Sequence, residues 1–505
     1  MTHPRAARVE MRMPIRLILS LALLSAPVLA AKPPNIVWIV ADDMSPDTAA
    51  YGMTGVSTPH LDRLAAEGAR FTRAYASAPV CSSSRSAFIL GVMQTTTGLH
   101  AHDVENPQPL PAPWRHLPGL LRDAGWHVTN APAPGTERGG RAVKKAKTHY
   151  NFAHDPAGMY DGDDWRKRRP GQPFFAQFQI VEPHRPFPIP EEYDDALMAR
   201  MSIPPNYPDH PLVRRDWYAY LRSVEVVDKR VGDILQQLAG EGVLDDTLVI
   251  FFADHGRPMP WGKQWLTIEG LRVPLLMRGP GVEAGRVEER LASLIDLAPT
   301  ALQLAGLPLP EWMQGRPLLG APFPERERIF AARDRCGDAQ DHIRAVITAD
   351  HLFARHFHPG LSFMNWSGYK EASYPAMPLL RELAAAGSLT EMQARYLKPD
   401  RPPLELHDLK SDPLGVTGAA LSGDNARVLA RLSGELDQWI KDSGDRGGLP
   451  DPATEPGMEE IRKSKRQDYQ RTWERRGLGP EPSDAERVSW WLRQYGLAEP
   501  SPPPR

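Results

Sequence analysis

The chain has 505 residues, with 60 Lys and Arg against 62 Asp and Glu, and a formal net charge of −2. Proteins that bind phosphate backbones usually carry a basic excess, so this balance argues against nucleic acid as the main partner. Hydrophobic residues make up 41%, which is enough for a large core, and 2 cysteines are too few for a disulfide framework.

Residues 1–30 have the pattern of an export signal. Arginines between Arg5 and Arg16 precede a short apolar run at residues 17–24, and a cleavage point follows near Ala31. The run is shorter than the ~20 apolar residues that a transmembrane helix needs, and an uncleaved anchor is the alternative. We expect no transmembrane segment after signal cleavage, and a mature protein that is periplasmic or secreted.

Strand and helix patterns alternate along the first 310 residues or so. Residues 35–41 (NIVWIVA) and 247–252 (TLVIFF) are continuous apolar runs, typical of strands buried on both faces of a parallel sheet. Further strands are predicted at residues 173–181 and 273–277. Helices are predicted from Pro59 onward and at residues 117–124, 217–238 and 291–307. This alternation predicts an α/β fold, a mostly parallel sheet covered by helices.

The pattern of the sequence changes at about Ala376. Charged helical segments then alternate with Pro-containing loops, and residues 404–409 (LELHDL) suit one further strand. We therefore expect a main domain at residues 31–375, which carries the motifs described next, and a smaller C-terminal subdomain with a polar tail at residues 376–505.

Ligand-type side chains follow two of the predicted strands. Asp42 and Asp43 come directly after the first strand, and Asp254-His255 comes after the strand at residues 247–252. In open α/β sheets ligands bind at the carboxyl ends of strands, and adjacent carboxylates repel each other unless a cation lies between them. Each pair alone is equally suited to capping a turn, but together they favour a metal site.

A small polar run precedes a further helical pattern. Cys81 begins the run CSSSR, and SAFILG follows it. The free N–H groups of a helix N-terminus attract anions, and Arg85 adds a fixed positive charge there. Cys81 therefore lies where an oxyanion would be stabilised. The alternatives are a disulfide with Cys336 and an inert buried thiol.

The order of these motifs resembles the formylglycine-dependent sulfatase family, from about Asn35 to Pro413. The segments GKQWLTIEGLRVP at residues 262–274 and AARDR at 331–335 add to the resemblance, and the second is similar to a stretch in bacterial glycan sulfatases. Members that look similar include N-sulfoglucosamine sulfohydrolases. The resemblance implies an alkaline-phosphatase-like α/β sandwich with a large, mostly parallel sheet flanked by helices, plus a smaller C-terminal α+β subdomain.

The resemblance also implies two groups that the enzyme needs. One divalent metal, most often Ca²⁺, would be held by Asp42, Asp43, Cys81, Asp254 and His255. Cys81 would be oxidised to formylglycine by a formylglycine-generating or sulfatase-maturating enzyme, and Arg85 would hold the hydrated form. Ser83 stands where the family motif has Pro, or less often Ala.

Four further catalytic residues follow from the resemblance. Lys147 and Lys263, with the metal, would stabilise the charge that builds on the leaving oxygen in the transition state, with Lys144 and Lys145 as rival candidates for the first position. His184 would protonate the leaving oxygen, and His149 would take a proton from the formylglycine hydrate. His100 and His102, downstream of Cys81, line the pocket or serve structure alone.

These residues predict an exported sulfatase that hydrolyses sulfate esters, or N-sulfates, of a sulfated sugar or polysaccharide. Two alternatives remain open. One is a phosphodiesterase or phosphonate hydrolase on the same fold. The other is a catalytically inactive, sulfated-glycan-binding relative, because Ser83 departs from the motif.

Overall fold

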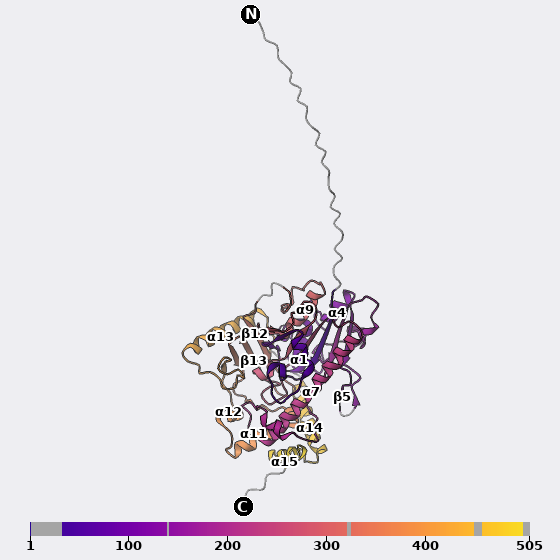
Figure 1. The fold of residues 1–505 in the computed structure, drawn as a ribbon. Coiled ribbons are helices and arrows are strands. Elements are labelled where there is room, and N and C mark those ends of the chain that lie inside the picture. Colours follow the sequence, from indigo (N-terminus) through magenta and orange to yellow (C-terminus); the bar gives the residue numbers. More distant parts are fainter. Residues whose placement is uncertain (2–32, 139–140, 321–324, 449–456, 498–505) are drawn as a thin grey trace, which may run out of the picture. The chain divides into compact units, whose positions relative to one another are not determined.

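A seven-stranded sheet forms the centre of the computed structural model (Figure 1), in the order β10-β2-β9-β8-β1-β7-β4. β1 (Asn35–Ala41) pairs in parallel with β8 (Thr247–Ala253) and with β7 (Phe174–Gln179), and β4 (His127–Pro132) extends the parallel part beyond β7. β9 (Leu275–Arg278) runs antiparallel to both of its neighbours. The structure describes residue 1 and residues 33–138, 141–320, 325–448 and 457–497.

Burial explains why the two central strands read as unbroken apolar runs. All seven residues of β1 and all seven of β8 are buried. The Trp38 ring packs edge-to-face against Phe88, Phe175 and Phe252, with centroids 5.1 to 6.0 Å away. Such aromatic pairs add to the free energy gained from burial alone, so they anchor the covering helix that carries Phe88 on the sheet.

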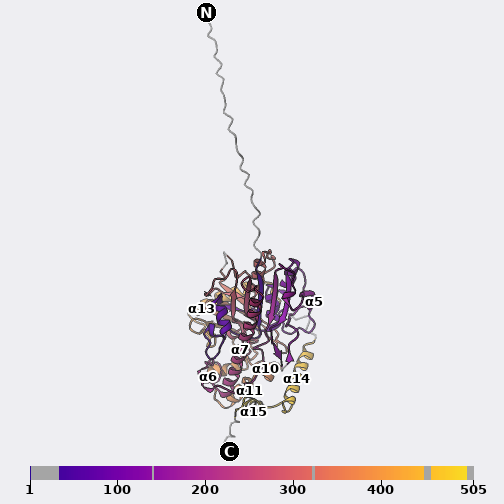
Figure 2. The same ribbon diagram turned by 45° about the vertical axis from the view of Figure 1, so that its right-hand side comes forward.

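Helices flank the sheet in two groups (Figures 1 and 2). α7 (Pro211–Gly240) packs with α1 (Pro59–Ala66), and α2 (Cys81–Leu90) packs with α4 (Leu117–Asp123) and α9 (Leu297–Leu304). α7 buries one long apolar stripe, as its pattern predicts, and begins six residues before the predicted start. The predicted α/β architecture is confirmed.

A second sheet is antiparallel and follows chain order, from β12 (Arg328–Arg333) through β13 (Ile343–Thr348) and β14 (His351–His356) to β15 (Leu404–Asp408). α13 (Asp424–Asp442) covers it, with Leu432 and Leu436 buried against Val346, Phe353 and Leu406. α10 (Gly368–Ser373) packs on α14 (Met458–Arg475), and α11 (Ala376–Ala385) packs on α15 (Asp484–Gln494).

The other described elements are short. They are η1 (Ala49–Tyr51), β2 (Ala69–Phe71), β3 (Ala74–Tyr75), α3 (Gln94–Thr97), β5 (Glu137–Arg138), β6 (Arg141–Ala142), α5 (Pro156–Met159), η2 (Trp165–Lys167), α6 (Asp195–Arg200), α8 (Ile268–Leu271), β10 (Arg286–Glu288), β11 (Ala292–Ser293), η3 (Leu294–Asp296), α12 (Glu391–Ala394) and η4 (Arg395–Leu397). No helix among the described residues contains a stretch that is long and apolar enough to cross a membrane.

One predicted helix is wrong at its start. Residues 291–307 read as one helix, but Ala292 and Ser293 form β11 beside β3, and α9 begins only at Leu297. The Asp296 carboxylate accepts the backbone N–H of Ser293 at 2.8 Å, which starts the helical turns at this point and not earlier.

Two predictions about chain organisation stay predictions. The export signal at residues 1–30 lies outside the described residues apart from Met1. The boundary between residues 375 and 376 falls inside the antiparallel sheet, since β12 to β14 precede it and β15 follows it. Residues 34–505 form one compact unit.

Candidate active site

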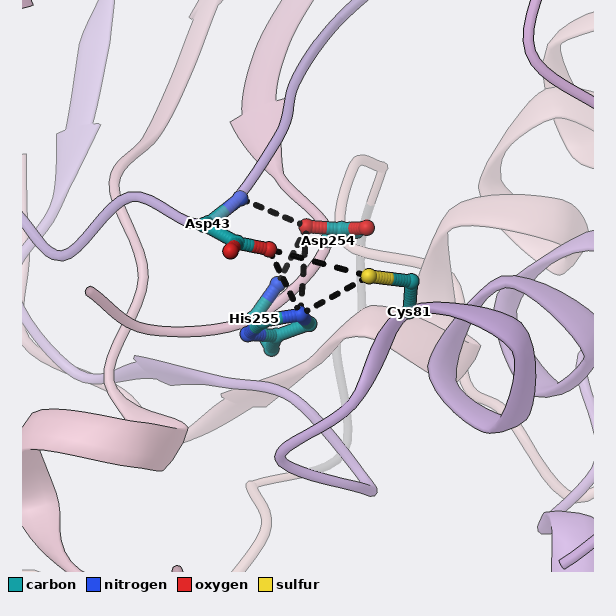
Figure 3. A group of neighbouring side chains, drawn as sticks. All are labelled: Asp43, Cys81, Asp254 and His255. Carbon is teal, nitrogen blue, oxygen red and sulfur yellow. Dashed lines mark hydrogen bonds and ion pairs between the residues drawn. The ribbon is translucent and has the colours of Figure 1, made fainter. Parts of the chain in front are cut away.

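The carboxyl ends of β1 and β8 bring the two acidic motifs together (Figure 3). Ala41 pairs with Ala253 in the last rung of these strands, so the residues that follow leave the sheet side by side. Asp43 has a φ of 61°, which is uncommon for a residue other than Gly. Asp254 Oδ1 accepts the backbone N–H groups of both Asp43 and His255 at 3.0 Å. One carboxylate therefore fixes both motifs.

Cys81 is the first residue of α2 and points into this cluster (Figure 3). Its Sγ lies 3.3 Å from His255 Nε2, 3.6 Å from Asp43 Oδ1 and 3.5 Å from Lys263 Nζ. Burial opposes ionisation of the thiol, but Lys147 and Lys263 outweigh it and lower the pKa of Cys81 to about 7. The position of Sγ therefore favours an atom that carries negative charge.

Arg85, one turn along α2, joins the ends of three strands. Its guanidinium donates to Asp254 Oδ2 at 2.8 Å, to Gln179 Oε1 at 2.8 Å and to Asp42 Oδ1 at 3.4 Å. All of these side chains are buried. Such a planar, fixed donor set binds two carboxylates at once and holds α2 against the sheet. Its predicted contact with a formylglycine hydrate stays a prediction.

Two lysine–aspartate pairs lie on either side of Cys81. Lys147 Nζ lies 2.7 Å from both carboxylate oxygens of Asp42, and Lys263 Nζ lies 3.0 and 2.8 Å from those of Asp43. Burial lowers the pKa of each lysine, but the aspartates outweigh it and the pKa is raised. Both groups therefore stay charged. The rival residues Lys144 and Lys145 are exposed.

The two predicted catalytic histidines have different partners. His149 Nε2 lies 2.6 Å from Asp103 Oδ1; burial lowers the pKa of His149, but Asp103 outweighs it and the pKa is raised. His184 Nδ1 lies 2.6 Å from the carbonyl oxygen of Arg185, and its Nε2 lies 3.8 Å from Asp43 Oδ2. Burial and Lys263 lower the pKa of His184. His149 is thus biased toward the charged form and His184 toward the neutral one.

The predicted metal ligands fall into two overlapping groups. Atoms of Asp43, Cys81, Asp254 and His255 lie within 4.8 Å of one another, and Asp42 belongs to a neighbouring group with Asp43 and His184. Carboxylate oxygens are the donors that Ca²⁺ and Mg²⁺ prefer, and an imidazole adds a nitrogen donor. Buried, convergent carboxylates beside an imidazole fit a divalent cation, although Lys147 engages both oxygens of Asp42.

The loop after α3 is tied to the start of α2. Ser82 Oγ lies 2.9 Å from His102 Nδ1, and Ser83 Oγ donates to the carbonyl oxygen of His100 at 3.0 Å. Cys81 and Cys336 are both buried free thiols, so the alternative of a disulfide between them is wrong. The predicted site residues thus come together around Cys81, and their individual roles stay predictions.

Sequence reasoning missed three side chains at this site. Asp103 orients His149, and Gln179 accepts from Arg85 at the end of β7. Tyr369, in α10, lies with its ring 5.2 Å from Lys263 Nζ and 5.9 Å from the His184 ring. Its buried hydroxyl has no hydrogen-bond partner among the described residues. The position of Asp103 directly after His102 could have marked it as a candidate site residue. No sequence pattern marked Gln179 or Tyr369.

A sequence model described as Sulfatase matches residues 34–307, more than half of the chain and all of the strands that carry the cluster. The chain belongs to the sulfatase family. It is therefore a sulfuric ester hydrolase, as the motifs predict.

An ulvan-active sulfatase from Formosa agariphila is 32% identical over 472 residues, covering 83% of this chain and 76% of the relative. The N-sulphoglucosamine sulphohydrolase of Homo sapiens is 28% identical over 472 residues, covering 81% and 90%.

Solved structures share the fold of this sulfatase. A protein in complex with its substrate D-glucosamine-2-N,6-O-disulfate has a TM-score of 0.57 at 18% identity, covering 83% of this chain and 100% of that one. A phosphonate monoester hydrolase from Silicibacter pomeroyi has a TM-score of 0.58 at 19% identity, covering 82% and 96%. These likenesses show the alkaline-phosphatase-like fold that the sequence predicts.

Ser83 causes no visible distortion in this sulfatase. It is the third residue of α2, in the first turn, where backbone N–H groups have no partner within the helix and proline is tolerated. The Ser83 hydroxyl donates to His100 and accepts from the Asn151 amide at 3.4 Å. Serine in place of the motif proline therefore leaves the helix start intact and ties it to a neighbouring loop.

Proposed function

We propose that this protein is an exported sulfatase that removes sulfate from a sulfated glycan, using a formylglycine made from Cys81 and one divalent cation, Ca²⁺. The observation that carries the proposal is the position of Cys81 Sγ, 3.3 to 3.6 Å from His255, Lys263 and Asp43 at the start of a helix. Formylglycine would supply a hydrated aldehyde whose hydroxyl attacks sulfur and which can be regenerated afterwards.

The cation is supported by the donor set and by the charge of the site. Three buried carboxylates, those of Asp42, Asp43 and Asp254, already face three cationic side chains, those of Arg85, Lys147 and Lys263. A divalent ion added to this balanced set leaves the site positive, which suits an anionic ester. When bound, it would act as a Lewis acid on an oxygen of the ester.

The side chains of this chain divide the remaining work. Lys147 and Lys263 would supply fixed positive charge for the negative charge that grows on the leaving oxygen in the transition state. His184 lies beside Asp43 with its Nδ1 engaged by a carbonyl oxygen, which leaves its Nε2 as the atom toward Asp43. A bound sulfate ester is an anion and would favour protonation of this nitrogen, which would then pass its proton to the leaving oxygen. His149, whose Nε2 engages Asp103, would take a proton from the formylglycine hydrate once it has released its own proton, because only the neutral imidazole is a base.

A sulfated glycan is the substrate class that the comparisons favour. Two relatives that cover most of this chain are named for ulvan and N-sulphoglucosamine. The related fold of a phosphonate monoester hydrolase keeps phosphonate hydrolysis as the second candidate. Export rests on the sequence of residues 1–30 alone.

Maturation of Cys81 would precede folding. Cys81 is 2% exposed, and Ser82 to Arg85 are 0 to 1% exposed, so no second protein can reach the motif in the folded chain. A maturation enzyme would therefore act on the unfolded chain, either before or after export.

The proposal is tested with a substrate panel: an aryl sulfate, a sulfated glycan, an aryl phosphate diester and an aryl phosphonate. Protein purified from its native host with Ca²⁺ is expected to release sulfate fastest, and Cys81→Ala is expected to abolish release. Faster turnover of the phosphonate would favour the second candidate. Glycan binding without release of any product would identify a catalytically inactive binder.

A further inference from the structure

A cavity of about 1070 Å³ lies beside the antiparallel sheet. Its walls come from the loop between β12 and β13, from the residues after β14, and from α14. Ligand sites usually measure ~300–1,000 Å³, so this one is large enough for more than a single sugar ring. The sulfatase chemistry described above uses none of the charged residues that line it.

Two segments of the cavity wall are bonded to residues next to the Cys81 site. His100 and Ala101 form part of its wall, and the carbonyl oxygen of His100 accepts from Ser83, two residues from Cys81. Across the cavity, Asp338 accepts the backbone N–H of Gly368 at 3.0 Å, and the next residue is Tyr369, whose ring lies over Lys263. The cavity is therefore placed to receive a part of the substrate beyond the sulfate at Cys81.

Two buried polar atoms in the wall are left without partners. His100 Nδ1 and Asp334 Oδ2 have no hydrogen-bond partner in the part of the chain that the structure describes, and their residues are 8% and 6% exposed. Buried polar atoms are normally satisfied. One donor-or-acceptor nitrogen and one carboxylate oxygen are the groups that bind sugar hydroxyls, and the half-buried ring of Trp366 in the same wall suits the apolar face of a sugar.

Charged side chains in the cavity wall differ in their partners. Asp334 Oδ1 is bound by Arg344 at 3.2 Å, Asp341 by Arg401, and Arg466 by Glu481. Arg462, on α14, donates to the neutral side-chain oxygen of Gln340 and has no carboxylate within ion-pair distance among the described residues. A guanidinium in a cavity wall without a carboxylate is suited to a ligand carboxylate or sulfate.

We propose that this cavity binds the sugar unit adjoining the sulfated one, and that Arg462 selects a unit carrying a carboxylate or a second sulfate. The preferred substrate is then a polyanionic glycan. This inference rests on the proposed function for the position of the sulfated unit, but binding of the adjoining unit is measurable without turnover.

The test uses calorimetry on the full-length protein with Ca²⁺ and a panel of disaccharides that lack the scissile sulfate. Each is supplied in an acidic form, uronate or sulfated, and in a carboxyl-reduced or unsulfated form. At least one acidic form is expected to bind about tenfold more tightly than its neutral partner, as one charge-assisted pair would give. Arg462→Gln is expected to remove that difference without changing the affinity for the neutral form.

Arg471→Gln is the matched control, because Arg471 is exposed on the same helix and is paired with Asp468 at 2.6 Å. It should bind like the wild type. Equal binding of acidic and neutral forms throughout the panel, or a preference that survives in Arg462→Gln, would overturn the inference. Sulfate release from an aryl sulfate is measured separately, so failure of the proposed function and failure of this inference give different results.

Discussion

The Cys81 site and the neighbouring cavity differ in how far their polar groups are satisfied. At the Cys81 site Arg85, Lys147 and Lys263 are each paired with an aspartate, and the donor atoms of four residues converge within 4.8 Å. In the cavity wall His100 and Asp334 keep orphan polar atoms, and Arg462 has only a neutral partner among the described residues.

This difference suggests separate tasks: the Cys81 site carries out the reaction, and the cavity selects the substrate. Groups that stabilise a transition state act best when they are held in place before the substrate arrives, which the paired site achieves. Groups that recognise a ligand are left incomplete until the ligand completes them. Changes at the first site should therefore affect every substrate, and changes at the second should affect only substrates with the right adjoining unit.

Removal of the metal should have the largest effect. Dialysis against a chelator is expected to lower sulfate release by more than ~10³-fold on aryl and glycan substrates alike, because a Lewis acid contributes several kcal/mol to the barrier. Added Ca²⁺ should restore activity and raise the melting temperature. Full activity in protein shown by elemental analysis to hold no divalent metal would contradict the metal assignment.

Lys263→Gln should lower kcat by ~10²–10³-fold for every substrate, since it removes one preorganised charge beside Cys81. Lys229→Gln is the control, because Lys229 is exposed on α7 and forms a surface pair with Asp233 at 2.9 Å. Steady-state kinetics on an aryl sulfate measures the effect. A loss confined to glycan substrates would place Lys263 in selection and not in chemistry.

Asp103→Asn should lower kcat by ~10–10²-fold and leave KM nearly unchanged, because the variant loses the anionic partner of His149 but no substrate contact. Asp123→Asn is the surface control, since Asp123 is exposed and paired with Arg115. A rise in KM with unchanged kcat would show that Asp103 binds substrate instead of positioning His149.

Acid should weaken the antiparallel sheet beside the cavity. Burial raises the pKa of Glu405, but His356 and Arg395 outweigh it and lower the pKa from 4.5 to about 2. The ionised Glu405 carboxylate therefore contributes its full stabilisation above pH ~4.5. About 1–3 kcal/mol of the free energy of unfolding is lost as the pH falls toward 2. In Glu405→Gln the free energy of unfolding should depend less steeply on pH between about 4.5 and 2, as acid unfolding measures it. The same pH dependence in the variant and the wild type would contradict the role given to Glu405.

The catalytic cluster was predictable because its residues are tied to strand ends. Asp42, Asp43, Asp254 and His255 follow apolar runs directly, and neighbouring parallel strands must end at the same edge. The local sequence around Cys81 adds a helix start with an arginine one turn later. The resemblance to sulfatases then added Lys147, His149, His184 and Lys263, which no local pattern marks.

The rest depended on long-range packing. Tyr369 and Arg462 lie more than a hundred residues beyond the motifs they approach, and they reach the site through the packing of α10 on α14. Asp103 could have been found beside His102, but its role depends on a hydrogen bond to His149 that spacing does not predict. The start of α9 was missed because a local capping box outweighed an apolar helical pattern.

The most direct measurement is the mass of the tryptic peptide Ala74–Arg85 from protein made in its native host. The account predicts an aldehyde in place of the Cys81 thiol, together with sulfate release by the same preparation. An unmodified thiol in protein that still releases sulfate would contradict the proposed nucleophile, and the metal site would then need a different partner in catalysis.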